Sequence, residues 1–144
     1  MLLALFKIKE MDLLKVYLAG SLDSDWQSKV IARFGNDFTF YNPKDHELND
    51  SLEYTTWDLF YLKKSDIIFA FMEKNNPSGF GLTLEIGYAK ALGLTIILVD
   101  EKTQNDNTFK DKFKIVRDSA NVVYDSLEDG LQFLSSFLRT NKLK

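Results

Sequence analysis

The sequence predicts one α/β domain in which a five-stranded parallel sheet lies between two layers of helices. Five short apolar runs occur along the chain, and segments with apolar residues at helical spacing separate them. Such alternation is typical of a parallel sheet covered on both faces and joined by right-handed crossovers. The size agrees, because 144 residues that are 45% hydrophobic and 27% charged suit a single globular domain. For five strands the expected order across the sheet is 2-1-3-4-5.

The first half of the chain supplies three strands and two helices. The apolar run at 16–19 ends at a Gly-Ser pair and predicts a buried strand followed by a tight turn. Apolar residues at helical spacing over 24–34 predict a helix, and the run at 38–41, closed by Asn-Pro, predicts the second strand. After a polar loop, a second helix is expected from about residue 52 or 56 to 64. The most continuous apolar run, 67–71, predicts a central strand that is buried on both faces.

The second half continues the alternation. Residues 73–81 contain Asn, Pro and Gly and predict a loop. The helix expected over 82–92 ends at Gly93, because glycine is a common C-terminal cap. The remaining elements are expected as a strand at 95–99, a helix at 109–118, a strand at 122–124 and a helix at 127–139.

Composition excludes several classes of function. A net charge of −3 and a pI near 5.2 give no general attraction to nucleic acid polymers or to anionic membranes. The chain has no cysteine, so disulfides and thiolate zinc sites are excluded. With a single histidine, His46, a histidine-based metal site or a Ser-His-Asp triad is disfavoured. We therefore expect neither a metal nor a cofactor, and we interpret His46, in a polar loop, as a solvated surface residue.

The N-terminus is expected to be an extension rather than a targeting segment. The apolar start at 1–6 is shorter than the apolar core of a signal peptide or a membrane span, and no cleavage pattern follows it. Residues 1–14 are therefore interpreted as an extension and lead-in, and 15–140 as one domain. Since no other segment is apolar for as long as a membrane span, we expect a cytoplasmic protein.

The predicted topology directs attention to Glu85. In a sheet of this order, ligands bind beyond the carboxyl ends of the strands where the strand order reverses, here between the first and third strands. Glu85 comes early in the helix after the third strand, where unpaired N–H groups and the helix dipole favour negative charge. We expect Glu85 to stay ionised, which suits a nucleophile. The alternative is that it is only an acidic residue near a helix start.

Asp58 and Tyr17 are further candidates at the same crevice. Two carboxylates beside one pocket suit glycosidic bond cleavage, in which one attacks and the other handles a proton or the sugar hydroxyls. The alternative for Asp58 is structural, because Thr55 could cap the helix with Asp58 three residues later. Tyr17 could equally be a core aromatic. The pair Gly79 and Gly81 is too short for a dinucleotide fingerprint.

Several stretches resemble the nucleoside 2-deoxyribosyltransferase family, in a divergent branch. These stretches are 17–21, Asp58, 65–68, 81–89 and 96–99. The Glu-Ile-Gly-Tyr-Ala sequence that begins at Glu85 is the most specific of them. The resemblance implies a flavodoxin-like three-layer sandwich. It also implies that Glu85 attacks the anomeric carbon and forms a covalent sugar intermediate, that Asp58 holds the deoxyribose or assists with the proton, and that Tyr17 positions the glutamate.

The chain also departs from the family pattern. Typical transferases carry an acidic residue in the loop before the catalytic helix, where it contacts the base, and residues 77–80 contain none. Family sites are completed by an Asn near the C-terminus of a neighbouring subunit. Asn121 matches that residue only by position.

The leading functional prediction is cleavage of the N-glycosidic bond of 2-deoxyribonucleosides, with transfer of the sugar to another base. The residues assigned to substrate binding are Gly20, Ser21, Ser78, Gly79 and Gly81. The expected partners are a nucleoside or nucleotide, a free base, and further copies of the chain in a homodimer or higher oligomer. One alternative is a hydrolase of 2-deoxynucleoside 5′-monophosphates, with Ser21, Ser78 and Gly79 at the phosphate. Another is a non-catalytic nucleotide-binding module.

Overall fold

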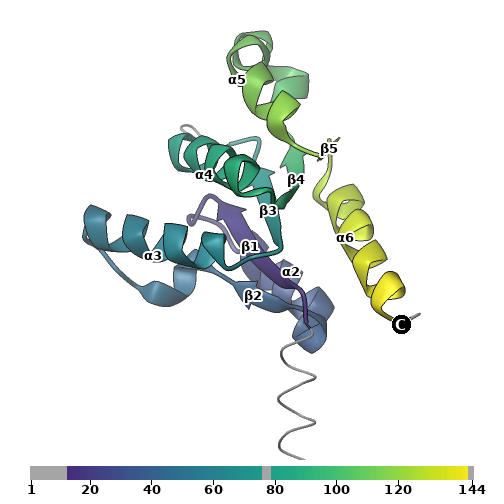
Figure 1. Cartoon of the computed structure of the whole chain (residues 1–144). Coiled ribbons are helices and arrows are strands. Elements are labelled where there is room, and N and C mark those ends of the chain that lie inside the picture. Colours follow the sequence, from purple (N-terminus) through teal and green to yellow (C-terminus); the bar gives the residue numbers. More distant parts are fainter. Residues whose placement is uncertain (1–12, 76–78, 143–144) are drawn as a thin grey trace, which may run out of the picture.

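One parallel sheet organises the chain (Figure 1). The computed structural model describes residues 13–75 and 79–142 and has five strands in the order β2-β1-β3-β4-β5. The strands are β1 (Lys15–Gly20), β2 (Thr39–Tyr41), β3 (Ile67–Met72), β4 (Thr95–Asp100) and β5 (Val122–Tyr124). All neighbouring strands run parallel. The predicted fold class and strand order are therefore confirmed.

Helices cover both faces of this sheet. The helices are α2 (Trp26–Phe34), α3 (Ser51–Lys63), α4 (Phe80–Leu92), α5 (Asn107–Ser119) and α6 (Leu127–Lys142). The helices α2 and α6 lie on one face, and α3, α4 and α5 lie on the other (Figure 1). Among the described residues, no helix is long and apolar enough to cross a membrane.

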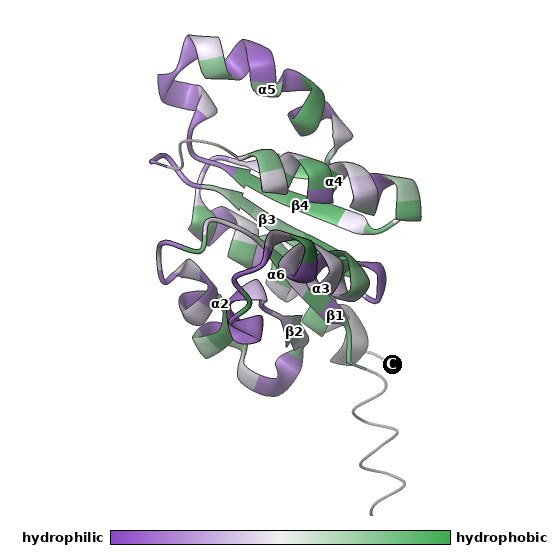
Figure 2. Cartoon of the chain, turned by 90° about the vertical axis from the view of Figure 1, so that its left-hand side faces the viewer, coloured by the Kyte–Doolittle hydropathy of each residue, from purple (hydrophilic) through white to green (hydrophobic). Residues whose placement is uncertain are grey.

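Each face of the sheet has its own apolar core. On one face Phe69 of β3 belongs to a cluster with Trp26 of α2 and Leu134 of α6. On the other face Ile68 of β3 belongs to a cluster with Ile86 of α4. All six residues of β3 are buried, and Figure 2 shows β3 and β4 as hydrophobic strands between more polar helices. Because both faces of these central strands are buried, their sequences are continuous apolar runs and do not alternate between apolar and polar residues.

The helix before β3 begins earlier than a cap at Thr55 would place it. It starts at Ser51 because the Asp50 carboxylate, at the N-cap, accepts a hydrogen bond from the Glu53 N–H at 3.1 Å. Asp58 is therefore well inside α3, and the capping alternative for Asp58 is wrong. The segment expected as a polar loop also contains a short 3₁₀ helix, η2 (Pro43–His46), which brings His46 back towards α3.

Asp100 is a buried carboxylate that ties later parts of the chain to the end of β4. Its oxygens accept hydrogen bonds from the N–H groups of Lys102 and Thr103, at 3.0 and 3.1 Å, and from the Thr103 hydroxyl. Arg117 of α5 donates to it at 2.6 Å. Asp100 has no exposed surface, so these donors stabilise its charge in place of water.

We expect Asp100→Ala to lower the free energy of unfolding by about 3 kcal/mol, because Arg117 and two amide donors lose their partner. Urea denaturation measures this loss. The matched control is Asp118→Ala, which removes an exposed carboxylate from α5 and should change the free energy by less than about 0.5 kcal/mol. Equal effects of the two substitutions would contradict the structural role of Asp100.

Candidate active site

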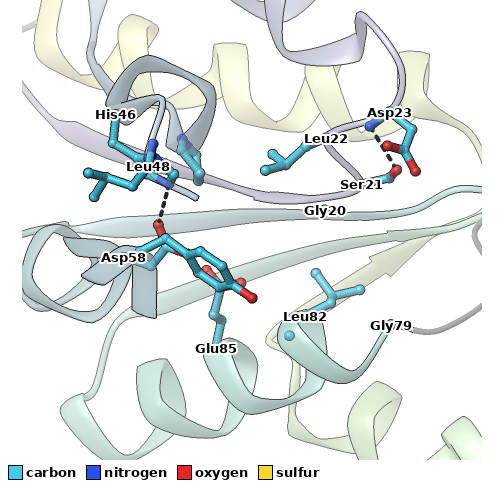
Figure 3. Close-up of a pocket in the computed structure, with 13 residues that line it drawn as sticks. Gly20, Ser21, Leu22, Asp23, His46, Leu48, Asp58, Gly79, Leu82 and Glu85 are labelled. Carbon is cyan, nitrogen blue, oxygen red and sulfur yellow. Dashed lines mark hydrogen bonds and ion pairs between the residues drawn. The ribbon is translucent and has the colours of Figure 1, made fainter. Parts of the chain in front are cut away.

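A cavity of about 450 Å³ opens at the carboxyl edge of the sheet, beyond the ends of β1 and β3. Its walls come from the loop after β1, from η2, from α3 and from the start of α4 (Figure 3). The loop after β1 contributes Gly20 and Ser21 to the lining, and the loop after β3 contributes Gly79. The cavity therefore lies where the strand order reverses, as the predicted topology requires.

The loop after β1 is held in place by its own neighbours. The Ser21 carbonyl accepts hydrogen bonds from Trp26 Nε1 at 3.0 Å and from Gln27 Nε2 at 2.8 Å, and both side chains are buried. Gly20 has φ +153°, and a Cβ there would lie 2.6 Å from the Phe71 carbonyl oxygen of β3. Only glycine allows β1 and β3 to approach so closely at this point. These contacts fix the path of the backbone along this wall of the cavity.

The start of α4 forms the opposite wall. Gly79 has φ +68°, and a Cβ there would lie 2.5 Å from Met72 Cε. Gly81 lies one turn before Glu85, and a Cβ on Gly81 would be 3.9 Å from Glu85 Oε1. The two glycines thus keep the backbone close to β3 and leave space beside the Glu85 carboxyl. Ser78, assigned to substrate binding from the sequence, lies outside the described residues.

Glu85 lies deeper in the protein than its place in the sequence suggests. Its Oε2 atom is buried and makes no hydrogen bond within the described chain. Burial raises the pKa of Glu85 to about 8, and the negative charge of Asp58 adds to the shift while the Tyr17 hydroxyl opposes it. The expectation that Glu85 stays ionised is therefore wrong for the free protein at neutral pH. The helix dipole acts mainly within the first turn, and Glu85 lies beyond that turn, so the cost of burying charge prevails.

Tyr17 and Asp58 lie against Glu85. Tyr17 is fully buried on β1, and its hydroxyl is close enough to both carboxyls that each influences its pKa. Burial, followed by these two negative charges, raises the pKa of Tyr17 far above its usual range, so the phenol stays neutral. Burial also raises the pKa of Asp58, and the neighbouring His46 and Tyr17 oppose that shift. The structure thus brings together the three residues that the sequence assigned to catalysis.

His46 is a member of the site that the sequence analysis placed wrongly. Its side chain is 6% exposed, and Nε2 lies 3.5 Å from Asp58 Oδ1 (Figure 3). Nδ1 accepts a hydrogen bond from the Leu48 N–H at 2.8 Å, so we infer that Nε2 carries the hydrogen and points it at Asp58. Trp57 packs edge-on against the imidazole at 5.0 Å. His46 follows the second strand at the carboxyl edge of the sheet, and that position could have signalled its role.

Three polar atoms in this cluster have unmet hydrogen-bonding capacity. The Tyr17 hydroxyl, Asp58 Oδ1 and Glu85 Oε2 are buried, and none makes a hydrogen bond of normal geometry in the described structure, although His46 Nε2 lies 3.5 Å from Asp58 Oδ1 and the Tyr17 hydroxyl lies close to both carboxyls. Unpaired buried polar atoms cost free energy, and they commonly mark sites where a ligand supplies the missing partner. Within the same described ranges, no group of three His, Asp or Glu residues could hold a metal ion. The cluster can therefore bind hydroxyl groups and present two carboxyls to one substrate.

A family model decides the relationship of this chain to known proteins. The model described as "Nucleoside 2-deoxyribosyltransferase like" matches residues 13–103, which include every member of the cluster. The chain belongs to the nucleoside 2-deoxyribosyltransferase-like family. The resemblance seen in the sequence is thereby confirmed. No curated protein matches the sequence closely enough to count as a relative.

Two solved structures share the fold of this family member. A 2-desoxiribosyltransferase from Leishmania mexicana has a TM-score of 0.65 at 18% identity, over 85% of this chain and 97% of its own. A CMP N-glycosidase, BcmB, from Clostridium botulinum has a TM-score of 0.55 at 22% identity, over 84% of this chain and 98% of its own. At these identities the similarity establishes the fold.

Asn121 is outside the cavity of its own chain. Its Oδ1 accepts a hydrogen bond from the Ile96 N–H at 2.7 Å, next to the start of β4. This is the amino edge of the sheet, whereas the cavity opens at the carboxyl edge. The side chain therefore stabilises the β4–β5 pair, and the structure gives no reason to assign it to a neighbouring active site.

Proposed function

We propose that this protein cleaves the N-glycosidic bond of 2-deoxyribonucleosides and transfers the deoxyribosyl group to another base. The observation that carries the proposal is the pairing of Glu85 and Asp58 around the Tyr17 hydroxyl, in a cavity at the switch point of the sheet. Two carboxyls around one reacting carbon are what glycosidic cleavage requires. Family membership supports the same chemistry. We take residues 15–140 as the catalytic unit.

In the first half of the reaction the Glu85 carboxylate attacks C1′ of the sugar. The bond from C1′ to the base nitrogen breaks, and the base leaves with the electron pair and takes up a proton. Asp58, whose pKa burial raises and which faces His46 Nε2, is placed to supply that proton. Tyr17, a neutral donor between the carboxyls, orients Glu85 and binds it more strongly once it is ionised.

In the second half an acceptor base attacks C1′ of the sugar ester. The ester bond breaks, Glu85 leaves as a carboxylate, and the incoming base gives up its proton to Asp58, which donated one in the first half. With water as the acceptor the same intermediate would release free deoxyribose. One protein of similar fold is named an N-glycosidase. For this reason hydrolysis of the N-glycosidic bond is the second candidate function.

A product assay separates these possibilities. The protein is incubated with each 2-deoxyribonucleoside, with and without a free acceptor base, and the products are separated by chromatography. Exchange of the base identifies a transferase, and free sugar identifies a hydrolase. Binding of the nucleoside without any product would refute catalysis and indicate a binding module.

We expect 2-deoxyribonucleosides to react faster than the matching ribonucleosides. The transition state carries positive charge at C1′ and the ring oxygen, and a 2′-hydroxyl withdraws electrons and makes that charge costlier. Parallel time courses with deoxyadenosine and adenosine measure the difference. Equal rates would contradict an oxocarbenium-like step at Glu85.

We expect the protein to form a homodimer or a higher oligomer. The outer sides of α3 and α4 expose large apolar residues, with Leu52 78%, Phe60 53% and Leu84 58% exposed. Burying such a surface between copies removes it from water. Light scattering at micromolar concentration tests this, with Phe60→Ser expected to weaken the assembly. A wild-type monomer under those conditions would contradict the expectation.

A further inference from the structure

Ser24 lies where three segments around the cavity meet. It directly follows residues 20–23, the part of the loop after β1 that lines the cavity (Figure 3). Its hydroxyl donates a hydrogen bond to the carboxylate of Glu73, the first residue after β3. Its carbonyl accepts a hydrogen bond from the Lys44 ammonium of η2. One partly buried residue thus joins the loop after β1 to η2 and to the segment that connects β3 with α4.

These contacts differ from those that hold the loop on its own helix. Trp26 and Gln27, which donate to the Ser21 carbonyl, belong to α2, the helix that directly follows the loop. They set the path of the loop, but they do not bind it to η2 or to the segment after β3. The partners of Ser24 are 20 and 49 residues away in the chain. Contacts with them therefore fix distances between segments that the chain does not connect directly.

We propose that Ser24 is a positioning residue, which holds these three segments at the spacing that the nucleoside requires. The inference rests on the proposed function for its substrate. Ser24 is not among the residues that line the cavity, and it faces a separate hollow of about 320 Å³. Its effect on the substrate therefore passes through its neighbours, which are residues 20–23 on the loop and Pro43 and His46 on η2.

The groups assigned to the reaction do not depend on Ser24 for their place. Tyr17 lies on β1, Asp58 on α3 and Glu85 on α4, and an apolar cluster on that face of the sheet holds these elements together. A loop released from Ser24 would spend part of its time away from the binding conformation. The apparent affinity falls by the fraction of molecules that remain competent to bind. Loss of the contact should therefore raise KM and leave kcat nearly unchanged.

A double-mutant cycle tests the contact between Ser24 and Glu73. Ser24→Ala and Glu73→Ala each remove one partner, and each should raise KM for a 2-deoxyribonucleoside about tenfold while kcat stays within about threefold of the wild type. The double variant should match the single variants, because a contact that is already broken cannot be lost again. Ser24→Thr retains the hydroxyl and should keep KM within about threefold of the wild-type value.

Amide hydrogen exchange tests the same contact without catalysis. The Asp23 N–H donates to Ser21 Oγ at 3.1 Å, on the part of the loop next to Ser24. In Ser24→Ala and Glu73→Ala the amides of residues 21–23, followed by NMR, should exchange about tenfold faster than in the wild type, because the loop opens more easily. Ser24→Thr should keep the wild-type exchange rates.

Two matched controls change nearby residues outside this contact. Ser28→Ala removes the hydroxyl of an exposed serine on α2. Glu101→Ala removes a carboxylate that lines the same hollow as Glu73. Neither substitution should change KM or the exchange rates of the loop. Urea denaturation verifies that each variant is folded under the assay conditions.

The outcomes separate this inference from the proposed function. If Ser24→Ala leaves KM and exchange unchanged, or if the effects of the two substitutions add, the inference is wrong while glycosidic cleavage stands. A fall in kcat alone would also overturn it. If the wild type converts no nucleoside, the proposed function fails, and the exchange rates still decide whether Ser24 holds the loop. If Ser24→Ala does not fold, Glu73→Ala tests the contact from its other partner.

Discussion

Glu85→Gln and Glu85→Ala are both expected to abolish turnover while the protein remains folded. The carboxylate forms the covalent bond to C1′, and loss of an essential nucleophile commonly costs many orders of magnitude in rate. The residue as a whole keeps some exposed surface although its Oε2 atom is buried, and Oε2 has no hydrogen-bond partner among the described residues, so its removal sacrifices little packing. The measurements are kcat for base exchange and the far-UV circular dichroism spectrum of each variant.

Asp58→Ala provides the graded comparison for the Glu85 variants. A group that handles a proton contributes roughly 10²–10⁴-fold, so this variant should retain measurable activity. The Glu85 assignment fails if Glu85→Gln keeps more than a few per cent of wild-type activity. If Glu85→Ala instead unfolds the protein, the residue is structural and the alternative reading from the sequence was the right one.

The second large effect is expected in the pH dependence of stability. The pKa of Glu85 is about 8 in the folded protein and 4.5 in an unperturbed glutamate. The folded state therefore binds the proton more tightly than the unfolded state. The contribution of Glu85 to stability is highest below pH 4.5 and is lost as the pH rises towards 8, with a slope of up to about 1.4 kcal/mol per pH unit.

Glu85→Gln isolates this contribution, because glutamine is close in shape and does not titrate. The free energy of unfolding is measured for both proteins by urea denaturation between pH 5 and 9. The wild type should lose stability relative to Glu85→Gln up to about pH 8 and then run parallel to it. The same titration should appear in kcat/KM for a neutral nucleoside, which should rise with pH through that range. A constant difference in stability would show that Glu85 is ionised at neutral pH.

Much of the fold follows from the sequence because the signals involved are local. Five apolar runs separated by helical segments suffice for a parallel sheet, and handedness and crossover rules leave few strand orders. Once the order is known, the carboxyl ends of β1 and β3 identify the cavity, and with it Gly20, Ser21, Gly79 and Glu85. The resemblance to the family also lies in these segments, above all in residues 17–21 and 81–89.

What the tertiary structure decided concerns contacts between distant segments. His46 looked like a surface residue because its neighbours in the chain are polar, yet η2 turns it into the space beside Asp58 and Trp57 of α3. The helix dipole, a local effect, predicted that Glu85 stays ionised. The protonation state of Glu85 depends instead on its burial in the fold, which raises its pKa, and on Tyr17 and Asp58, which come from other elements. Sequence periodicity determines which face of an element is buried, whereas the desolvation of a charge depends on everything packed around it, and only the assembled fold determines that environment.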